Sequence, residues 1–287
     1  MSVNGKILAA LCLATAALAI ATSGSAGDNE PRPITVASTT STQNSGLFAA
    51  LLPKFTAETG IDVNVVAVGT GQAIRIATNG DADVLLVHHE ASERKFVADG
   101  LGLARRPVMH NDFVLVGPAD DPAGIRGMND VAAALRRIGD GEHVFVSRGD
   151  DSGTHKKELE LWQAGGFDPR PASGTWYREA GSGMGATLNT AGGMDGYTLS
   201  DRASWVSFGN KGELEILVEG DARLHNPYTA IVVNPERHPH VHAREAQAFV
   251  DWLTSRRGQA AIAAFRVDGQ QLFFPDAVSA GGGAEDD

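Results

Sequence analysis

Apolar segments typical of β-strands alternate with helical segments early in the chain, and this alternation restricts the fold more than any other feature of the sequence. The strand-like segments are residues 31–38, 61–69 and 82–89. Between the first two, Leu47, Leu51 and Phe55 recur at helical spacing, and Gly60 ends the helix. The alternation predicts a parallel α/β sheet, in which ligands gather at the carboxyl ends of the strands.

A second α/β set lies between two similar apolar segments, residues 112–118 and 228–235. Its elements, and the long helical region that follows the second apolar segment, are residues 131–139, 143–149, 155–166, 184–192 and 243–265. The simplest organisation has a first lobe, residues 31–113 and 229–276, interrupted by a second lobe, residues 114–228. Because the chain crosses between the lobes twice, we expect an α/β protein that closes on a ligand.

The ends of the chain predict export and a disordered tail. Residues 1–26 place one charge, Lys6, before an apolar run from Ile7 to Ala21 and then small residues, which is the layout of a signal peptide. The run is shorter than the ~20 apolar residues of a membrane span. We therefore expect a periplasmic protein. Residues 277–287 are glycine-rich and acidic, and we expect them to be disordered.

Charge and cysteine content restrict the partners. The net charge is −11, and removal of residues 1–26, whose only charge is Lys6, makes it −12. An acidic surface argues against nucleic acid, which is bound through clustered Lys and Arg. The only cysteine, Cys12, lies in the predicted signal peptide, so the mature chain can have neither disulfides nor cysteine catalysis. An anionic ligand would have to be attracted locally, because the protein as a whole repels it.

The first of three candidate anion-binding turns contains five consecutive hydroxyl residues. They follow the first strand and precede a helix, where the helix dipole favours negative charge: Ser38, Thr39, Thr40, Ser41 and Thr42. Ordinary capping of the helix is the alternative, but a cap needs only one such residue. We therefore expect Ser38, Thr39, Thr40 and Ser41 to offer donors to a ligand.

The other two turns also connect a strand to a helix. The second contains Thr70 and Gly71, where glycine lets the backbone approach a ligand closely, although glycine turns of this kind are common. In the third, a helix start presents hydroxyl and backbone donors beside a permanent cation: Arg148, Ser152, Gly153 and Thr154. Asp150 could pair with the arginine and hold it in place. Three such turns in two facing lobes indicate a site for a small, fully ionised oxyanion.

The sequence resembles the tungstate-binding proteins of bacterial ABC importers, which are relatives of the phosphate-binding proteins. The resemblance is carried by "STTSTQNSGLF", "VGTGQAI", "GDADVLLVHH", "NDFVLVGP", "SRGDDSGTHKKE", "YTLSDR", "NPYTAIVVNP" and "WLTSRRGQ", in that order over residues 34–275. It implies the type II periplasmic-binding fold, two α/β lobes joined by two crossing strands. It also implies tungstate or molybdate as ligand, a membrane permease and its ATPase as partners, a monomer, no cofactor and no enzymatic activity.

One chemical difference favours tungstate over phosphate. Hydrogen phosphate carries a proton near neutral pH, so a specific site needs a carboxylate to accept it, whereas a tungstate dianion needs donors only. The phosphate-binding proteins have an aspartate at the end of the third strand, and His88 stands at that place in this sequence. Phosphate stays open as an alternative ligand, because Asp83 or another acid could accept the proton.

Two other classes of protein remain as alternatives. Ser152 and His155 raise the possibility of a secreted hydrolase, but the G-x-S-x-G elbow is absent. A zinc-uptake protein could use a histidine cluster that we prefer to read as a solvated loop: His238, His240 and His242. In the second lobe Tyr197 and Thr198 could touch the ligand, but packing of the tyrosine in the core is an equal alternative.

Overall fold

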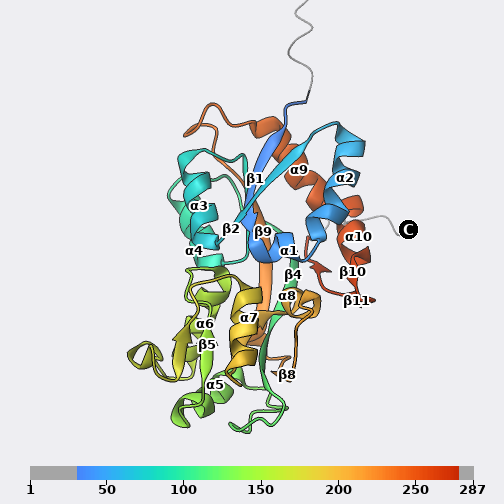
Figure 1. Ribbon diagram of the computed structural model, residues 1–287. Coiled ribbons are helices and arrows are strands. Elements are labelled where there is room, and N and C mark those ends of the chain that lie inside the picture. Colours follow the sequence, from blue (N-terminus) through green and yellow to red (C-terminus); the bar gives the residue numbers. More distant parts are fainter. Residues whose placement is uncertain (1–30, 278–287) are drawn as a thin grey trace, which may run out of the picture. The chain divides into compact units, whose positions relative to one another are not determined.

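The computed structural model describes residues 31–277, in which two lobes of sheet and helices share two strands (Figure 1). The predicted signal peptide, residues 1–26 with Cys12, lies outside the described residues, and so does the predicted tail beyond Ala277. No helix within residues 31–277 combines the length and apolar character of a membrane span.

The first lobe is built on one mixed sheet with the strand order β12-β4-β9-β3-β1-β2. Its strands are β1 (Ile34–Thr39), β2 (Val63–Val68), β3 (Val84–Val87), β4 (Arg106–Pro118), β9 (His225–Val232) and β12 (Phe274–Pro275). The prediction of parallel pairing is correct for β2, β1 and β3. It is wrong for β4 and β9, which pair antiparallel with each other, because the chain leaves the lobe on one and returns on the other.

Helices cover both faces of this sheet. They are α1 (Thr40–Asn44), α2 (Leu47–Thr59), α3 (Thr70–Asn79), α4 (Glu90–Ala98), α9 (Ala243–Thr254) and α10 (Arg256–Ala264). The cores place α2, α9 and α10 on one face and α3 and α4 on the other. The predicted continuous helix over residues 243–265 is wrong: Ser255 is extended, and its Oγ accepts the Gly258 N–H to start α10.

The second lobe has helices on both sides of short strands. Its elements are α5 (Val131–Asp140), β5 (Phe145–Ser147), α6 (Gly153–Ala164), β6 (Tyr177–Glu179), α7 (Met184–Gly193), β7 (Thr198–Asp201), α8 (Arg202–Ser207) and β8 (Leu214–Val218). Two further short strands, β10 (Arg266–Val267) and β11 (Gln270–Gln271), form a hairpin after α10. Fully buried Phe145, Trp162 and Tyr197 form the core under α5 and α6, and Leu188 of α7 packs in a separate cluster with β4.

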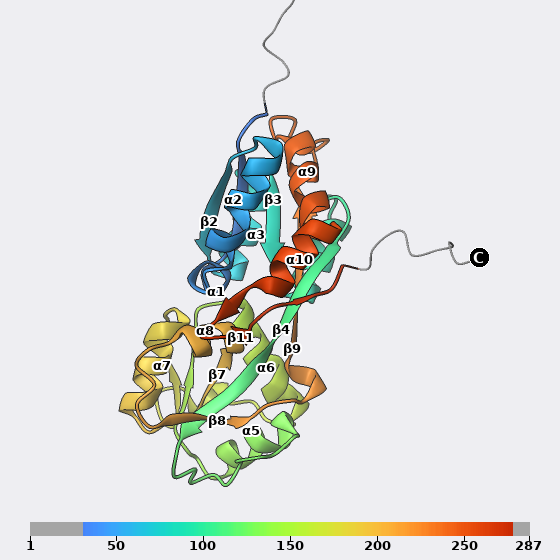
Figure 2. The ribbon, with the colours of Figure 1, turned by 90° about the vertical axis from the view of Figure 1, so that its right-hand side faces the viewer.

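The strand β4 belongs to both lobes (Figure 2). Its residues 106–112 pair with β9, whereas residues 113–118 pair with β7 and β8. The change of partner falls at Asp112 and Phe113. The crossing strands therefore begin earlier than the predicted segments 112–118 and 228–235, at Arg106 and His225.

We expect Phe249→Ala to destabilise the fold strongly. Phe249 is fully buried on α9, with its ring centroid 5.0 Å from that of Phe55, so truncation leaves a cavity between α9 and α2. The free energy of unfolding in urea should fall by about 3–5 kcal/mol. Leu103→Ala is the matched control, because Leu103 is 42% exposed and its truncation should change stability by less than about 0.5 kcal/mol. Equal effects of the two changes would contradict this assignment of the core.

Candidate functional site

Two residues of the first turn have hydroxyl groups bonded within the first lobe, and two others line a cavity. Ser38 and Thr39 end β1: the Ser38 hydroxyl donates to the Leu86 carbonyl (2.7 Å), and Thr39 Oγ1 accepts the Thr42 N–H to cap α1. Thr40 and Ser41, the first residues of α1, line a cavity of about 160 Å³. The four predicted residues therefore lie together, with the hydroxyl groups of Ser38 and Thr39 already bonded within the first lobe.

The second turn places a free hydroxyl at the start of α3. Thr70 is fully buried, and its Oγ1 has no hydrogen-bond partner among the described residues. A Cβ added at Gly71 would meet the Asp151 carboxylate of the second lobe, so the second turn lies against the loop that contains the third.

The third turn connects β5 to α6 and holds a buried cation. Arg148 is 4% exposed, its guanidinium donates to Asp150 Oδ2, and its Nε has no partner in the described part of the chain. Asp150 also accepts the Ser152 N–H, so it fixes both the arginine and the start of the helix. Ser152 caps α6 by accepting the His155 N–H, and Thr154 Oγ1 is buried with no hydrogen-bond partner within residues 31–277. Asp150 thus has the predicted contact with the arginine.

The structure brings the three turns together. Arg148 lines the same cavity as Thr40 and Ser41. A Cβ added at Gly153 would lie 3.0 Å from Thr70 Oγ1 and 2.7 Å from the His88 ring, so the helix start of the second lobe lies against the second turn of the first. Three donors in these turns have no partner in the described structure. They are Thr70 Oγ1 in the second turn, and Thr154 Oγ1 and Arg148 Nε in the third. Buried polar groups without a partner are rare, and a bound ion is one explanation for them.

The cavity also contains residues that the sequence analysis did not select. They are Asn44, Met184, Gly185, Ser204, Ser207 and Phe208. Met184 and Gly185 start α7, whereas Ser204 and Ser207 lie on α8 after the "YTLSD" strand. Glycines before α7 were a usable signal for a helix start facing a ligand. Nothing local marked the serines of α8, which reach the cavity through the pairing of β7 with β4.

A buried carboxyl group, Asp201, lies at the end of β7. Its Oδ1 accepts the Ser204 N–H (2.9 Å) and caps α8, and its Oδ2 has no partner among residues 31–277. Burial raises the pKa of Asp201, and the nearby charge of Arg148 opposes this rise. Thr198 Oγ1 of the same strand is buried and has no partner in the described part of the chain. Tyr197, the residue before the strand, packs in the core, and its hydroxyl bonds Asp121 and Ala123.

His88 is a neutral buried side chain. Its Nδ1 lies 2.9 Å from Asn226 Oδ1, and because the Asn226 amide nitrogen donates to Asn111, His88 Nδ1 is the donor of that pair. Burial lowers the pKa of His88 to about 4. The suggestion that Asp83 accepts a ligand proton is wrong, because its carboxylate accepts the N–H groups of Thr35 and His242 at the opposite end of β3.

Neither alternative motif assembles a working site. Ser152 Oγ accepts the His155 backbone N–H, while His155 Nδ1 accepts the Asp151 N–H, so the imidazole is not the base of a serine nucleophile. In the other motif His240 bonds the Gly80 carbonyl, His242 bonds the Pro33 carbonyl, and His238 packs on Gly80. These histidines do not converge on one point in the described structure.

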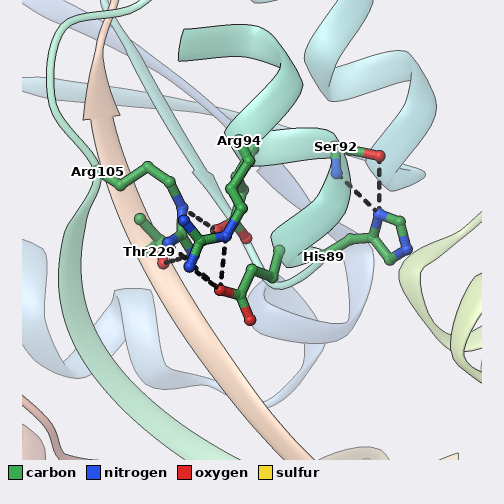
Figure 3. Close-up of polar contacts among 7 residues, drawn as sticks. His89, Ser92, Arg94, Arg105 and Thr229 are labelled. Atoms are coloured by element: carbon green, nitrogen blue, oxygen red, sulfur yellow. Dashed lines mark hydrogen bonds and ion pairs between the residues drawn. The ribbon is translucent and has the colours of Figure 1, made fainter. Parts of the chain in front are cut away.

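A polar network lies at the rim of the first lobe (Figure 3). There His89 Nδ1 accepts the Ser92 N–H to cap α4, and Arg105 donates to Glu93 (2.6 Å) and to Thr229 Oγ1 (3.4 Å). His89 Nε2 also lies 3.2 Å from Glu160 of α6, across the interface between the lobes. The hydrogen bond from His89 lowers the pKa of Glu160. Contacts across the rim and at Gly153 indicate that the lobes are closed.

Comparison with known proteins gives consistent results. The model of the PBP superfamily domain matches residues 21–257. The tungstate-binding protein TupA of Peptoclostridium acidaminophilum is 44% identical over 95% of this chain and 99% of its own. Two solved structures are also similar: the tungstate-binding protein TupA of Desulfovibrio alaskensis G20 (47% identity, 86% of this chain and 100% of that chain, TM-score 0.75) and the tungstate ABC transporter of Geobacter sulfurreducens (45%, 81% and 98%, 0.74).

We expect a buried glutamate on α6 to make stability fall as pH rises. The Tyr177 hydroxyl donates to Glu158 Oε1 (2.7 Å), and burial raises the pKa of Glu158 from 4.5 to about 7. The folded protein therefore holds this proton over a range where the unfolded chain loses it. The stabilisation is complete below about pH 4.5 and gone above about pH 7, a change of about 3 kcal/mol.

Glu158→Gln keeps the acceptor for Tyr177 and removes the titration. The difference in urea stability between this variant and the parent should change between pH 4.5 and 7 and level off outside that range. Comparison with the parent cancels the contributions of the other titrating groups to the pH dependence of stability. One of these groups is His88, whose lowered pKa makes stability rise with pH. A difference that is independent of pH would contradict the protonated state of Glu158.

Proposed function

Because the chain belongs to the PBP superfamily and, within it, to the family of the tungstate-binding proteins named TupA, we propose that it is the solute-binding protein of a tungstate importer. It captures the ion outside the cytoplasm, as a periplasmic protein does, and delivers it to an ABC permease driven by an ATPase. It acts as a monomer, needs no cofactor and catalyses no reaction.

The observation that carries the proposal is the set of unpaired buried donors. Thr70 Oγ1, Thr154 Oγ1 and Arg148 Nε come from both lobes, and each can donate a hydrogen bond to an anion. Arg148 supplies the positive charge, and its planar fork suits an oxyanion. Thr40 and Ser41 complete the wall of the first lobe. Unpaired buried donors supplied by both lobes favour a compact, fully ionised tetrahedral ion.

The site supports tungstate with molybdate as a second ligand. The two ions are almost isosteric, so the difference between them depends on small adjustments of the cavity. Phosphate is not favoured by the relatives, whose names refer to tungstate. Hydrogen phosphate would also need an acceptor, and His88 has its Nδ1 bonded to Asn226. Asp201 is the buried carboxyl group in the second lobe that a phosphate site would have to use.

The permease binds the rims of both lobes in the closed state. On this proposal the lobes are residues 31–113 with 229–276 and residues 114–228. Their rims come into contact only when the ligand has closed the protein. Contacts such as His89 to Glu160 join the rims in that state and report closure to a partner that touches both.

Calorimetric titration at neutral pH tests the proposed ligand. Tungstate and molybdate should bind with one ion per chain, and sulfate and phosphate should bind much more weakly because the site selects size and lacks a free acceptor near His88. Arg148→Ala should weaken the binding of every one of these ions. A response to phosphate alone, or unchanged affinity of all ions in Arg148→Ala, would exclude the proposal.

Thr154→Val and Thr70→Val separate binding from folding. Each removes a hydroxyl that is buried without a partner in the described structure, and the methyl group keeps the shape. The loss of a hydrogen bond to a charged ligand costs about 1.5–3 kcal/mol, so tungstate affinity should fall roughly 10- to 150-fold. The free energy of unfolding without ligand should stay equal or rise.

Thr190→Val is the matched control for both variants. Thr190 is exposed on α7, and its hydroxyl donates to the Ala186 carbonyl of its own helix. This variant should bind tungstate as the parent does. Unchanged affinity in Thr154→Val and Thr70→Val would remove both hydroxyl groups from the site.

A further inference from the structure

Three side chains outside the oxyanion site meet on the outer surface of the crossing strands. His110 lies on β4, His225 begins β9, and Asp276 follows β12, which pairs with β4 on its other side. Each offers one ligand atom, and these atoms all lie within 4.8 Å of one another. We propose that His110, His225 and Asp276 bind a divalent transition-metal ion of the zinc class.

Strand register produces this cluster. His110 pairs with Pro227 and Asp112 pairs with His225, so the two histidines are diagonal neighbours on one face of antiparallel strands. Their ring centroids are 4.7 Å apart. The ring of Phe274, paired opposite His110, stacks on it at 5.3 Å. Two ligands are thus held by regular strands, which define position better than loops do.

The third ligand is also fixed by the backbone. The Asp276 N–H donates to the Val108 carbonyl (3.1 Å), and the next N–H, that of Ala277, donates to Gln259 Oε1 (3.0 Å). The carboxylate lies 2.6 Å from His110 Nδ1. Tetrahedral zinc with bonds of about 2.0–2.1 Å needs ligand atoms roughly 3.3 Å apart. The present separations, 2.6 Å for His110 to Asp276 and at most 4.8 Å within the cluster, lie on either side of that value.

The surroundings leave room for the ion and its remaining ligand. Neither ring nitrogen of His225 has a hydrogen-bond partner among residues 31–277. A surface cavity of about 420 Å³ is lined by both histidines together with Asp112 and Asp221. Asp112 is engaged by Arg202 through both oxygens, so it is not a ligand and it neutralises the arginine that lines this cavity. Three protein ligands with an open fourth position, filled by water, are a known zinc arrangement.

The competing explanation for the cluster is an ion pair between His110 and Asp276 without any metal ion. His110 and Asp276 already interact, and that contact would suffice to hold β12 on β4. It does not account for His225, whose ring has no hydrogen-bond partner in the described chain and lies against His110. Two neutral imidazoles and a carboxylate are the ligand types that zinc and its neighbours in the first transition series prefer.

Titration of the purified, untagged chain with zinc chloride in a non-chelating buffer tests the proposal. The parent should bind one zinc per chain, and cobalt in its place should give the visible absorption of a four-coordinate ion. His225→Ala should lower zinc affinity roughly tenfold or more. Asp276→Asn should do the same, although its amide oxygen still accepts from His110, and it covers the case in which His225→Ala fails to fold.

His242→Ala is the matched control, because it removes a histidine of the other cluster that bonds the Pro33 carbonyl. It should bind zinc as the parent does. Absence of stoichiometric binding to the parent overturns the proposal. Zinc affinity that persists in both His225→Ala and Asp276→Asn, or that is lost in His242→Ala instead, also overturns it. The readout is metal binding alone, so its outcome is independent of the proposed oxyanion function.

Discussion

A guanidinium that is almost fully removed from water must have negative charge close to it, and this requirement organises the site around Arg148. Burial of an unpaired charge costs several kcal/mol, and loss of one partner of a buried pair costs about 3–5 kcal/mol. Asp150 supplies the paired charge and also accepts the Ser152 N–H. The same carboxylate therefore positions the cation and the helix start, while Arg148 Nε is left for a ligand.

Local charge explains how an acidic protein can bind an anion. The chain carries a net charge of −11, yet the cavity walls present hydroxyl groups, helix starts and one arginine. Asp201 is buried close enough to Arg148 to feel its charge, and burial raises the pKa of Asp201 and so disfavours its charged form. Over distances of more than about 8–10 Å the repulsion from surface carboxylates is screened by salt, so the short-range donors dominate.

The crossing strands connect the two proposed binding sites. β4 changes partner between the lobes, and Asn111 of β4 and Asn226 of β9 form the hydrogen bonds that reach His88. On the outer surface, the same two strands carry His110 and His225. On the proposed function, opening of the lobes changes the backbone angles of these strands, and groups attached to them on either side move with it.

The sequence by itself determined the local elements: the alternation of strands and helices, the two-lobed fold class, and the three turns with Asp150 beside Arg148. These follow from short-range spacing and capping chemistry. Only the tertiary structure decided that β4 and β9 pair antiparallel, and that Ser38 bonds Leu86 whereas Thr70 and Thr154 stay unpaired. It also brought Ser204 to the cavity and His110, His225 and Asp276 together. Strand register and lobe closure set these contacts between distant residues, and neither leaves a periodic signal in the sequence.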